Sequence, residues 1–304
     1  MDMKTRADRI LGCLMGGAIG DAIGAHYEGS APVSGTDPNE SPKPMWELDL
    51  CVTDDTQLTL ATCEAIVQAG RVDPDTIAER FVAWFQARRI TGIGSSTLKA
   101  LTELAAGGHW ALVGASGERS AGNGAAMRIA PLAFFLDPTS DADRRTLHDV
   151  CRITHRNEEA YCGALAMLAS IRLAAEGISL KQELLPRVVE LLPDSVTRDR
   201  LKQIHVERLK PFDAFKRFGS SGYVADSVPV ALAHAIQNPF MITAMMGAIC
   251  ASGGDTDTIG SMAGQIVGAS KGGTGLQNEQ GIFESIDLAQ EVTKLAKSLA
   301  MVPT

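Results

Sequence analysis

Two short acidic segments, one early and one late in the chain, carry the residue types best suited to chemistry. The first is Thr53-Asp54-Asp55-Thr56, and the second is Asp255-Thr256-Asp257-Thr258, which follows two glycines. Carboxylate and hydroxyl oxygens are the ligands of hard cations such as Mg²⁺, Mn²⁺ or Ca²⁺, and neither segment offers the His or Cys that zinc prefers. If the two segments meet in space, their four carboxylates can neutralise two divalent ions.

The alternative is that each acidic segment only caps the helix that follows it. Helix-forming residues fill 57–70, and apolar residues recur at helical spacing from Ile259 to Val267, so each segment stands before a predicted helix. Backbone N–H groups at a helix start lack partners, and Asp and Thr side chains commonly accept from them. For one segment alone, capping is as good an interpretation as a metal site. Two similar segments favour the metal site.

The elements that must position these segments are predicted to be helices. Helix-forming runs without strand-like alternation cover 55–70, 77–89, 158–176 and 238–251. No repeat and no shift in composition marks a boundary, so residues 1–304 are expected to form one all-α domain.

Finer features of the pattern predict how the helices pack. The run 161–176 has apolar residues on more than one face, which indicates a central helix. Small residues recur within 16–24 and again within 260–268, and at each stretch they allow neighbouring helices to approach closely. The segments 30–44, with four prolines, and 114–124, rich in Gly and Ser, are predicted loops.

Composition excludes several classes of function. The 304 residues are 45% hydrophobic and include 28 Lys+Arg against 36 Asp+Glu, and the resulting net charge of −8 disfavours nucleic acid as a partner. The most apolar long stretch, 228–251, is interrupted by polar residues, so no membrane span is expected. Six cysteines without a CxxC pair indicate reduced thiols and a cytoplasmic protein.

Taken in order, the motifs of this chain resemble those of the ADP-ribosylglycohydrolase family. They lie at 12–24, 53–56, 122–128 (GNGAAMR), 154–155, 222–226 and 253–260. The resemblance covers nearly the whole chain, and its most specific part is the pair of acidic motifs with GNGxxMR between them. It implies an all-α orthogonal helical bundle of a single domain, with two Mg²⁺ ions, or Mn²⁺, at the base of a cleft for ADP-ribose.

The resemblance also implies which residues do the chemistry. The implied metal ligands are Thr53, Asp54, Asp55, Asp255, Asp257 and Thr258. Among them, the carboxylates of Asp54, Asp55 and Asp257 are the candidates to position or deprotonate the attacking water. Glu28 matches a family glutamate at the mouth of the cleft, and its alternative interpretation is a solvated loop carboxylate. Asp21 is expected either to support the metal ligands or to end its helix.

Five further residues are candidates for the substrate side of the cleft. The backbone of Gly122, Asn123 and Gly124 can present N–H groups to a pyrophosphate, or can simply form a surface loop. In relatives the stretch that contains His155 and Tyr161 borders the adenosine, and Tyr161 is the candidate to stack on adenine. A structural histidine and a core tyrosine are equally good interpretations of these two residues. Arg128 is expected to be structural.

The implied activity is hydrolysis of mono-ADP-ribose from modified protein side chains, with arginine as the first choice of acceptor. Serine-linked ADP-ribose or a free ADP-ribose derivative is the alternative within the same class. From another class, the fold can serve an immunity or binding protein that occludes an ADP-ribosyltransferase. The expected partners are therefore an ADP-ribosylated protein and, under the last interpretation, a transferase.

Overall fold

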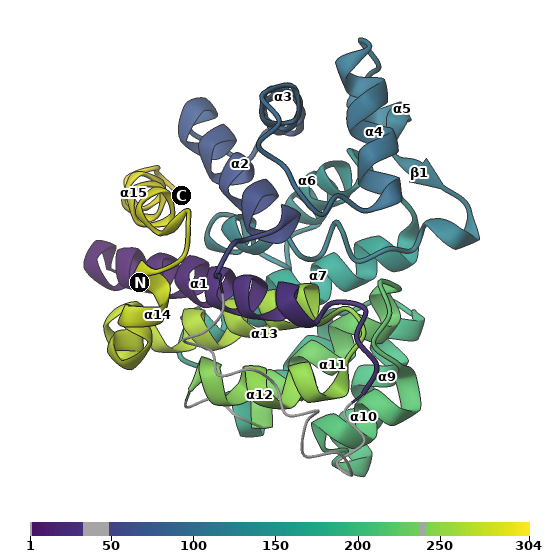
Figure 1. The fold of residues 1–304 in the computed structure, drawn as a ribbon. Helices are drawn as coiled ribbons and strands as arrows, with labels where there is room; N and C mark the ends of the chain where they lie inside the picture. The colour runs from purple at the N-terminus through teal and green to yellow at the C-terminus, as the bar shows by residue number, and fades with distance from the viewer. Residues whose placement is uncertain (1, 33–48, 238–240) are drawn as a thin grey trace.

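The computed structural model describes residues 2–32, 49–237 and 241–304, and these residues form a mostly helical bundle (Figure 1). The longer helices are α1 (Met3–Gly24), α2 (Asp54–Ala69), α3 (Pro74–Gln86), α4 (Ser95–Ala105), α6 (Asp141–Arg152), α7 (Glu158–Ala175), α9 (Val196–Glu207), α11 (Val224–Gln237), α12 (Ile242–Ser252), α13 (Thr256–Lys271) and α15 (Ala289–Ala300). The shorter ones are α5 (Trp110–Val113), α8 (Leu185–Leu191), α10 (Pro211–Phe218) and α14 (Gln280–Glu284). Short 3₁₀ helices are η1 (Ala25–Tyr27), η3 (Glu118–Ser120), η4 (Ala130–Phe134) and η6 (Thr274–Glu279), and η5 (Leu180–Leu184) is a short π-helix. The all-α prediction is confirmed.

The centre of the bundle is the pair α1 and α13, which lie side by side in Figure 1. Glycines of one helix face glycines of the other at three levels: Gly12 with Gly268, Gly16 with Gly264, and Gly20 with Gly260. Added Cβ atoms at Gly16 and Gly20 would lie 2.2 Å from the carbonyl oxygen of Gly264 and 2.1 Å from that of Gly260. Only glycine permits this separation, so the predicted close packing of the two small-residue stretches is confirmed. We call this contact the glycine seam.

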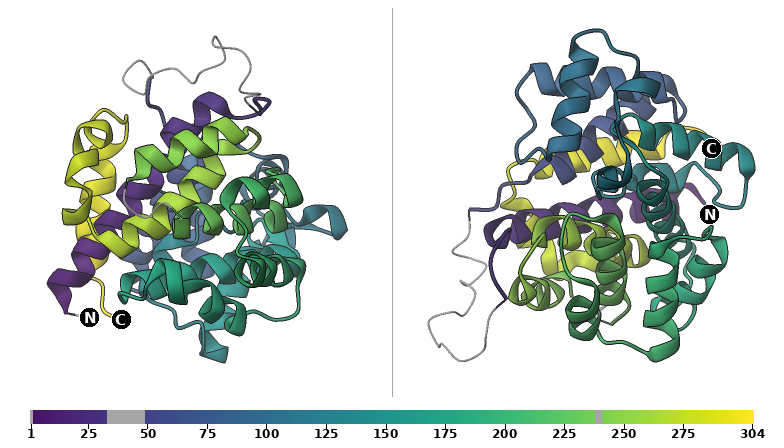
Figure 2. Two further views of the ribbon diagram at one scale, coloured as in Figure 1. Left: turned by 90° about the horizontal axis from the view of Figure 1, so that it is seen from below. Right: turned by 90° about the vertical axis from the view of Figure 1, so that its right-hand side faces the viewer.

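Other elements surround this pair. Helix α7 is buried on nearly every face and packs against α13 and α11, as expected for the predicted central helix. Helix α15 lies beside α1 and α2. The two chain ends lie close together in both views of Figure 2, where the Arg6 guanidinium donates to the carbonyl oxygens of Ala300 at 3.1 Å and Val302 at 2.8 Å.

The predicted loops have different outcomes. In 114–124 a two-residue strand, β1 (Ala115–Ser116), pairs in parallel with β2 (His155–Arg156), and this pairing holds the loop beside His155. Most of the other predicted loop, residues 33–44, lies outside the described residues, and so do residues 238–240 of the predicted helix 238–251. The rest of that run is helical from Ile242.

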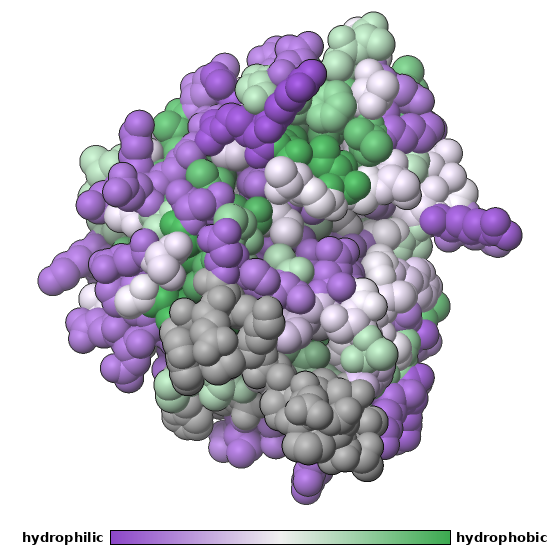
Figure 3. All heavy atoms as spheres, viewed as in Figure 1, coloured by the Kyte–Doolittle hydropathy of each residue, from purple (hydrophilic) through white to green (hydrophobic). Residues whose placement is uncertain are grey.

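The surface is mainly hydrophilic on the face drawn in Figure 3, where hydrophobic groups gather in limited areas. Within the described part of the chain, no helix combines the length and the apolar character needed to cross a bilayer. All six cysteines are free, and five of them are buried.

Candidate active site

The two acidic segments meet in the structure. Asp54 and Asp55 form the first turn of α2, Asp255 precedes α13, and Asp257 and Thr258 lie in its first turn. The Thr258 hydroxyl donates to Asp55 Oδ2 at 3.1 Å, across 203 positions of sequence. Contact between the segments contradicts the alternative in which each one serves only its own helix.

Local backbone geometry explains how α13 brings its carboxylates to this point. Gly253 and Gly254 both adopt positive φ, 72° and 83°, which favours glycine and lets the chain turn sharply after α12. The N–H of Gly254 donates to the carbonyl of Ser30 at 3.1 Å, and that of Gly29 donates to Gly254 at 2.8 Å. These bonds fix the strand of backbone that carries Glu28 beside the turn that carries Asp255.

The N-cap residue of neither helix makes a side-chain capping hydrogen bond. Thr53 and Asp255 are the N-cap residues of α2 and α13, and neither side chain makes a capping hydrogen bond. The start of α2 is instead capped from α1: the buried Asp21 carboxylate accepts from the N–H groups of Thr53 at 3.1 Å and Thr56 at 3.0 Å, and from the Thr53 hydroxyl at 2.7 Å. Because Asp21 binds these N–H groups, the carboxylates of Asp54 and Asp55 are not needed to cap α2.

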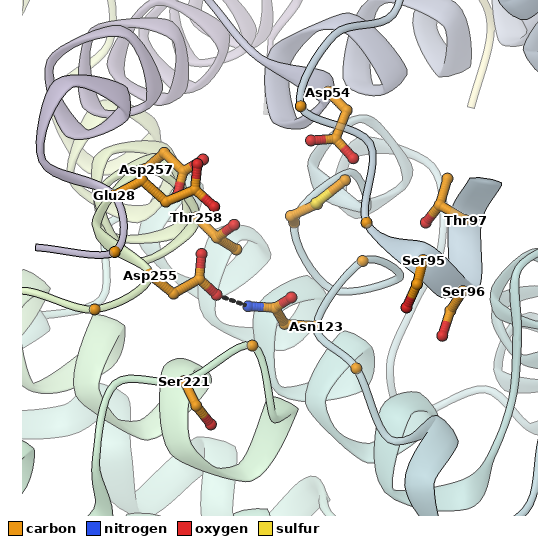
Figure 4. A pocket seen from close by; sticks show the side chains of 18 of the residues that line it. Glu28, Asp54, Ser95, Ser96, Thr97, Asn123, Ser221, Asp255, Asp257 and Thr258 are labelled. Carbon is orange, nitrogen blue, oxygen red and sulfur yellow. Dashed lines mark hydrogen bonds between the residues drawn. The ribbon is translucent and has the colours of Figure 1, made fainter.

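The carboxylates form two overlapping groups. Ligand oxygens of Asp21, Asp55 and Asp257 lie within 4.8 Å of one another, and so do those of Glu28, Asp255 and Asp257. Asp257 belongs to both groups. Figure 4 shows Glu28, Asp255 and Asp257 together on one side of a cavity, with Asp54 above it.

Burial and mutual repulsion raise the pKa of every carboxyl in these groups. Burial is the main cause for Asp21, whose pKa rises to about 6, and for Asp257, whose pKa rises to about 7 with a further contribution from Asp255. The pKa values of Asp54 and Asp55 are raised by burial and by the charges of Asp21 and Asp257. The charge of Asp257 raises the pKa of Glu28.

The donor set fits divalent cations. Asp55 Oδ1 and Asp257 Oδ1 are buried and have no hydrogen-bond partner among the described residues. Buried oxygens without partners are costly unless something compensates their charge. Because every candidate ligand is oxygen, Mg²⁺ or Mn²⁺ matches the site and a zinc site of His and Cys does not.

These carboxylates lie at one side of a cavity of about 440 Å³. Of the residues expected from the sequence, those lining the cavity are Glu28, Asp54, Gly122, Asn123, Gly124, His155, Asp255, Asp257 and Thr258. Asp55 and Thr53 do not line it: Asp55 lies behind and touches Thr258, and the Thr53 hydroxyl is bonded to Asp21.

Tyr161 is not brought to this cavity. Its half-buried ring packs edge-on against His148, with the ring centroids 5.0 Å apart. His155 does line the cavity, close to the loop 122–124. Of the two residues expected to contact adenosine, only His155 lines the cavity.

The loop 122–124 is held from two sides. Asn123 Nδ2 donates to Asp255 Oδ2 at 2.6 Å, the one bond drawn in Figure 4, and to Ser227 Oγ at 3.1 Å. On the other side, the fully buried Arg128 donates to the carbonyl of Gly124 and stacks over the Phe81 ring, 5.2 Å from its centroid. Arg128 is therefore structural, as expected, and it does not line the cavity.

Two groups of lining residues were not expected from the sequence. One comes from the start of α4 and the turn before it: Gly92, Gly94, Ser95, Ser96 and Thr97. The other, Ser220 and Ser221, follows α10 and directly precedes the motif 222–226, whose Gly222 also lines the cavity. The first had a usable signal, because glycines and hydroxyl residues directly before an amphipathic run are typical of a helix N-terminus.

Comparison with known proteins agrees with this geometry. The family model for ADP-ribosylglycohydrolase matches residues 2–303. The chain belongs to the ADP-ribosylglycohydrolase family. It is 30% identical to the ADP-ribosylarginine hydrolase Tri1 of Pseudomonas putida (strain GB-1), over 96% of this chain and 78% of that protein. It is 28% identical to the ADP-ribosyl-[dinitrogen reductase] glycohydrolase of Rhodospirillum rubrum, over 87% of this chain and 86% of the relative.

Other family relatives are similarly distant. The ADP-ribosylhydrolase ARH3 of Mus musculus is 26% identical over 97% of this chain and 91% of its own length. A solved structure described as an ADP-ribosylglycohydrolase-related protein complex superimposes with a TM-score of 0.72 at 27% identity, and covers 99% of this chain and 100% of that one. This ADP-ribosylglycohydrolase therefore shares its whole fold with the family.

Proposed function

We propose that this ADP-ribosylglycohydrolase removes mono-ADP-ribose from modified protein side chains, with arginine as the preferred acceptor. The observation that carries the proposal is the contact between the two acidic segments at one side of a cavity of about 440 Å³, a size suited to a small ligand. The choice of arginine rests on the relative from Pseudomonas putida, which is named an ADP-ribosylarginine hydrolase.

Six residues are proposed to hold two Mg²⁺ or Mn²⁺ ions: Thr53, Asp54, Asp55, Asp255, Asp257 and Thr258. Asp21, whose carboxylate lies within 4.8 Å of Asp55 and Asp257, is proposed to support them rather than to be a ligand. When bound, such ions orient the hydroxyls of a ribose and lower the pKa of a water.

The remaining steps belong to the side chains of the protein. Asp54, Asp55 and Asp257 are proposed to position the water or to take its proton. The water oxygen forms a bond to the anomeric carbon as the bond to the acceptor nitrogen breaks, and the acceptor leaves with a proton. Nearby carboxylates stabilise the positive charge that grows on the ribose ring.

Glu28 is proposed to meet the reacting end of the ribose from the rim. It is exposed, it lines the cavity, and its carboxylate lies within 4.8 Å of those of Asp255 and Asp257. The loop Gly122-Asn123-Gly124 and His155 are proposed to contact the substrate farther from the carboxylates. Tyr161 keeps its stacking role only if adenine extends beyond this cavity to the ring beside His148.

The test is release of ADP-ribose from arginine-modified and serine-modified protein, with Mg²⁺ and with EDTA. We expect release from the arginine substrate with Mg²⁺, loss of release with EDTA, and loss in Asp54→Asn. The control Asp194→Asn changes a carboxylate whose side chain is 92% exposed and should leave release unchanged. Faster release from the serine substrate would overturn the acceptor, and no release from either would overturn hydrolysis.

If no hydrolysis is observed, the same two proteins, wild type and Asp54→Asn, are tested for binding to an ADP-ribosyltransferase. Binding of an ADP-ribosyltransferase by both the wild type and Asp54→Asn would then favour occlusion of a partner over turnover.

A further inference from the structure

A second cavity, of about 350 Å³, lies between η5, α8, the end of α9 and the end of α11. Its floor is apolar, with Leu185 and Ile204 buried and Leu209 half-buried. Its rim is polar, and Lys181 and Arg208 are exposed there. The cavity is large enough to accept an apolar group of another molecule.

The charge at this rim is positive. No Asp or Glu is among the described residues that line the cavity. The side chains of Lys181 and Arg208 make neither an ion pair nor a hydrogen bond within the part of the chain that the structure describes. Two cations without partners beside an apolar floor favour a ligand that combines negative charge with an apolar group.

The basic character continues along α9 and α10, which both pack against α11 (Figure 1). Residues 196–218 include seven Lys or Arg and three Asp or Glu, whereas the whole chain has 28 and 36. Three of the seven are in ion pairs, and among the other four Lys202 and Lys210 are exposed. This part of an acidic protein therefore presents a basic surface.

The backbone beside the cavity is unusual on two sides. The segment η5, which carries Lys181, is a π-helix, a rare form that is often found at functional sites. Arg208, the C-cap residue of α9, has φ 53° and ψ 42°, in the left-handed region where glycine is the usual residue. Glycine would suit this backbone better than arginine, so a role for the Arg208 side chain would account for its presence.

Apolar side chains are also exposed outside the cavity on the same two helices. Val206 is 67% exposed and Phe212 is 53% exposed. The rings of Phe212 and Phe215 stack with their centroids 6.3 Å apart, and the Lys216 ammonium lies 4.4 Å from the Phe212 centroid. Because exposed apolar and cationic groups extend beyond the cavity, a protein segment fits this surface better than a small molecule does.

Helix α11 connects this cavity with the catalytic one. It starts just after Gly222, which lines the catalytic cavity, and ends at Gln237, which lines the second cavity. Its fourteen residues span about 20 Å. A partner bound at the second cavity therefore need not cover the carboxylates.

We propose that the cavity between α8, α9 and α11 is a docking site for an acidic segment of a partner protein. An apolar side chain of that segment enters the cavity, and its carboxylates pair with Lys181 and Arg208 at the rim. Nucleic acid is also negatively charged, but the apolar floor and the net charge of −8 on the whole chain favour a protein.

The experiment measures the fluorescence anisotropy of a labelled peptide in which glutamates flank a pair of leucines. One control peptide has serine in place of leucine, and another has glutamine in place of glutamate. Single-stranded DNA with the same net charge as the acidic peptide is the third control probe.

The protein offers a matched pair of variants. Arg208→Gly removes the guanidinium and places the favoured residue at a positive φ, so the fold should be kept. Arg88→Gly is its control, because Arg88 lies just after α3, has φ 55° and does not line this cavity. The two variants change the net charge equally. Thermal unfolding of each variant checks that the fold is intact.

We expect the wild type to bind the acidic leucine peptide, and Arg208→Gly and Lys181→Gln each to bind it about ten-fold more weakly, as for loss of a hydrogen bond to a charged group. Arg88→Gly should bind it like the wild type. Each of the three control probes should bind the wild type at least about ten-fold more weakly than the leucine peptide does.

Four results would each overturn the proposal. They are no binding of the acidic leucine peptide by the wild type, wild-type affinity in Arg208→Gly, equal losses in Arg208→Gly and Arg88→Gly, and a control probe that binds the wild type as tightly as the leucine peptide. Tight binding of the DNA would assign the basic surface to nucleic acid. None of these results depends on whether the protein hydrolyses ADP-ribose.

Discussion

Helix α13 meets α1 and α2 in opposite ways. Along most of its length it lies against α1 through the glycine seam, where backbone touches backbone and no side chain intervenes. At its first turn it meets α2 through carboxylates of like charge, two of which have an oxygen without a partner. The seam stabilises the fold, and the acidic contact opposes it. The comparison indicates that the close packing of helices in the glycine seam offsets the repulsion among the carboxylates of the site.

The largest loss of stability from adding a single carbon atom is expected in the glycine seam. In Gly264→Ala the new Cβ would lie 2.1 Å from the carbonyl oxygen of Gly16, and both helices would have to move. We expect the free energy of unfolding to fall by at least about 3 kcal/mol, as for severe overpacking. Urea denaturation monitored by circular dichroism measures it.

The matched control for this prediction is Gly247→Ala in α12, where a Cβ meets nothing within 4 Å. There we expect a gain of about 0.5–1 kcal/mol from helix propensity. Equal and small effects at both positions would contradict the role given to the seam.

A substitution in the acidic contact should raise the stability of the metal-free protein, whereas one in the glycine seam lowers it. Asp257→Asn removes the carboxylate that both groups share, so release of ADP-ribose should fall about 100-fold or more. Because a buried like charge is also lost, the metal-free variant should be more stable than the wild type, by about 1 kcal/mol. A variant that is inactive and less stable without metal would mean that Asp257 stabilises the fold.

The pH dependence of stability separates repulsion from metal binding. The pKa values of Asp257 and Asp21 are raised in the folded state, to about 7 and about 6, so the folded protein binds more protons than the unfolded chain between pH 4 and 7. In EDTA, protonation of these two carboxyls should therefore contribute about 2 kcal/mol of stability as the pH falls from 8 to 6. Saturating Mg²⁺ should abolish this contribution, so the difference in stability between Mg²⁺ and EDTA measures it apart from other titrating groups. The same pH dependence in EDTA and Mg²⁺ would argue against cations among these carboxylates.

His234 shows how burial without charge repulsion affects the pH dependence of stability. This α11 side chain is buried, neither ring nitrogen has a partner among the described residues, and burial lowers its pKa to about 4. The unfolded chain binds the extra proton, so stability should fall by about 1.5 kcal/mol from pH 6.5 to pH 5. In His234→Gln this part of the pH dependence should disappear, as urea midpoints at the two pH values will reveal. An unchanged profile would assign the acid sensitivity to other groups.

The sequence was most informative where local rules decide the structure. The starts of α2 and α13, the turn at Gly253-Gly254 and close helix packing at each glycine-rich stretch all followed from residue type and spacing. The register of the seam did not, because Gly16 can face any of several small residues until the whole bundle is packed. Contact between the acidic segments likewise depends on α1, α2 and α13 packing together, and the family resemblance was needed to expect it.

Other features had no sequence signal of their own. Asp21 caps a helix 32 positions away, and such a long-range cap leaves no local pattern. The segment 95–97 carries hydroxyl groups that are common at any helix start, so its place in the cavity depends on where Gln57 holds the preceding turn. Tyr161 was selected for its chemistry, but α7 turns it toward His148.

The shared position of Asp257 has a consequence for how this protein can change over evolutionary time. Since one carboxylate completes both groups, no substitution there can adjust one half of the centre and preserve the other. Descendants that lose this aspartate would lose both halves in a single step, and the relief from repulsion would favour keeping the inactive form.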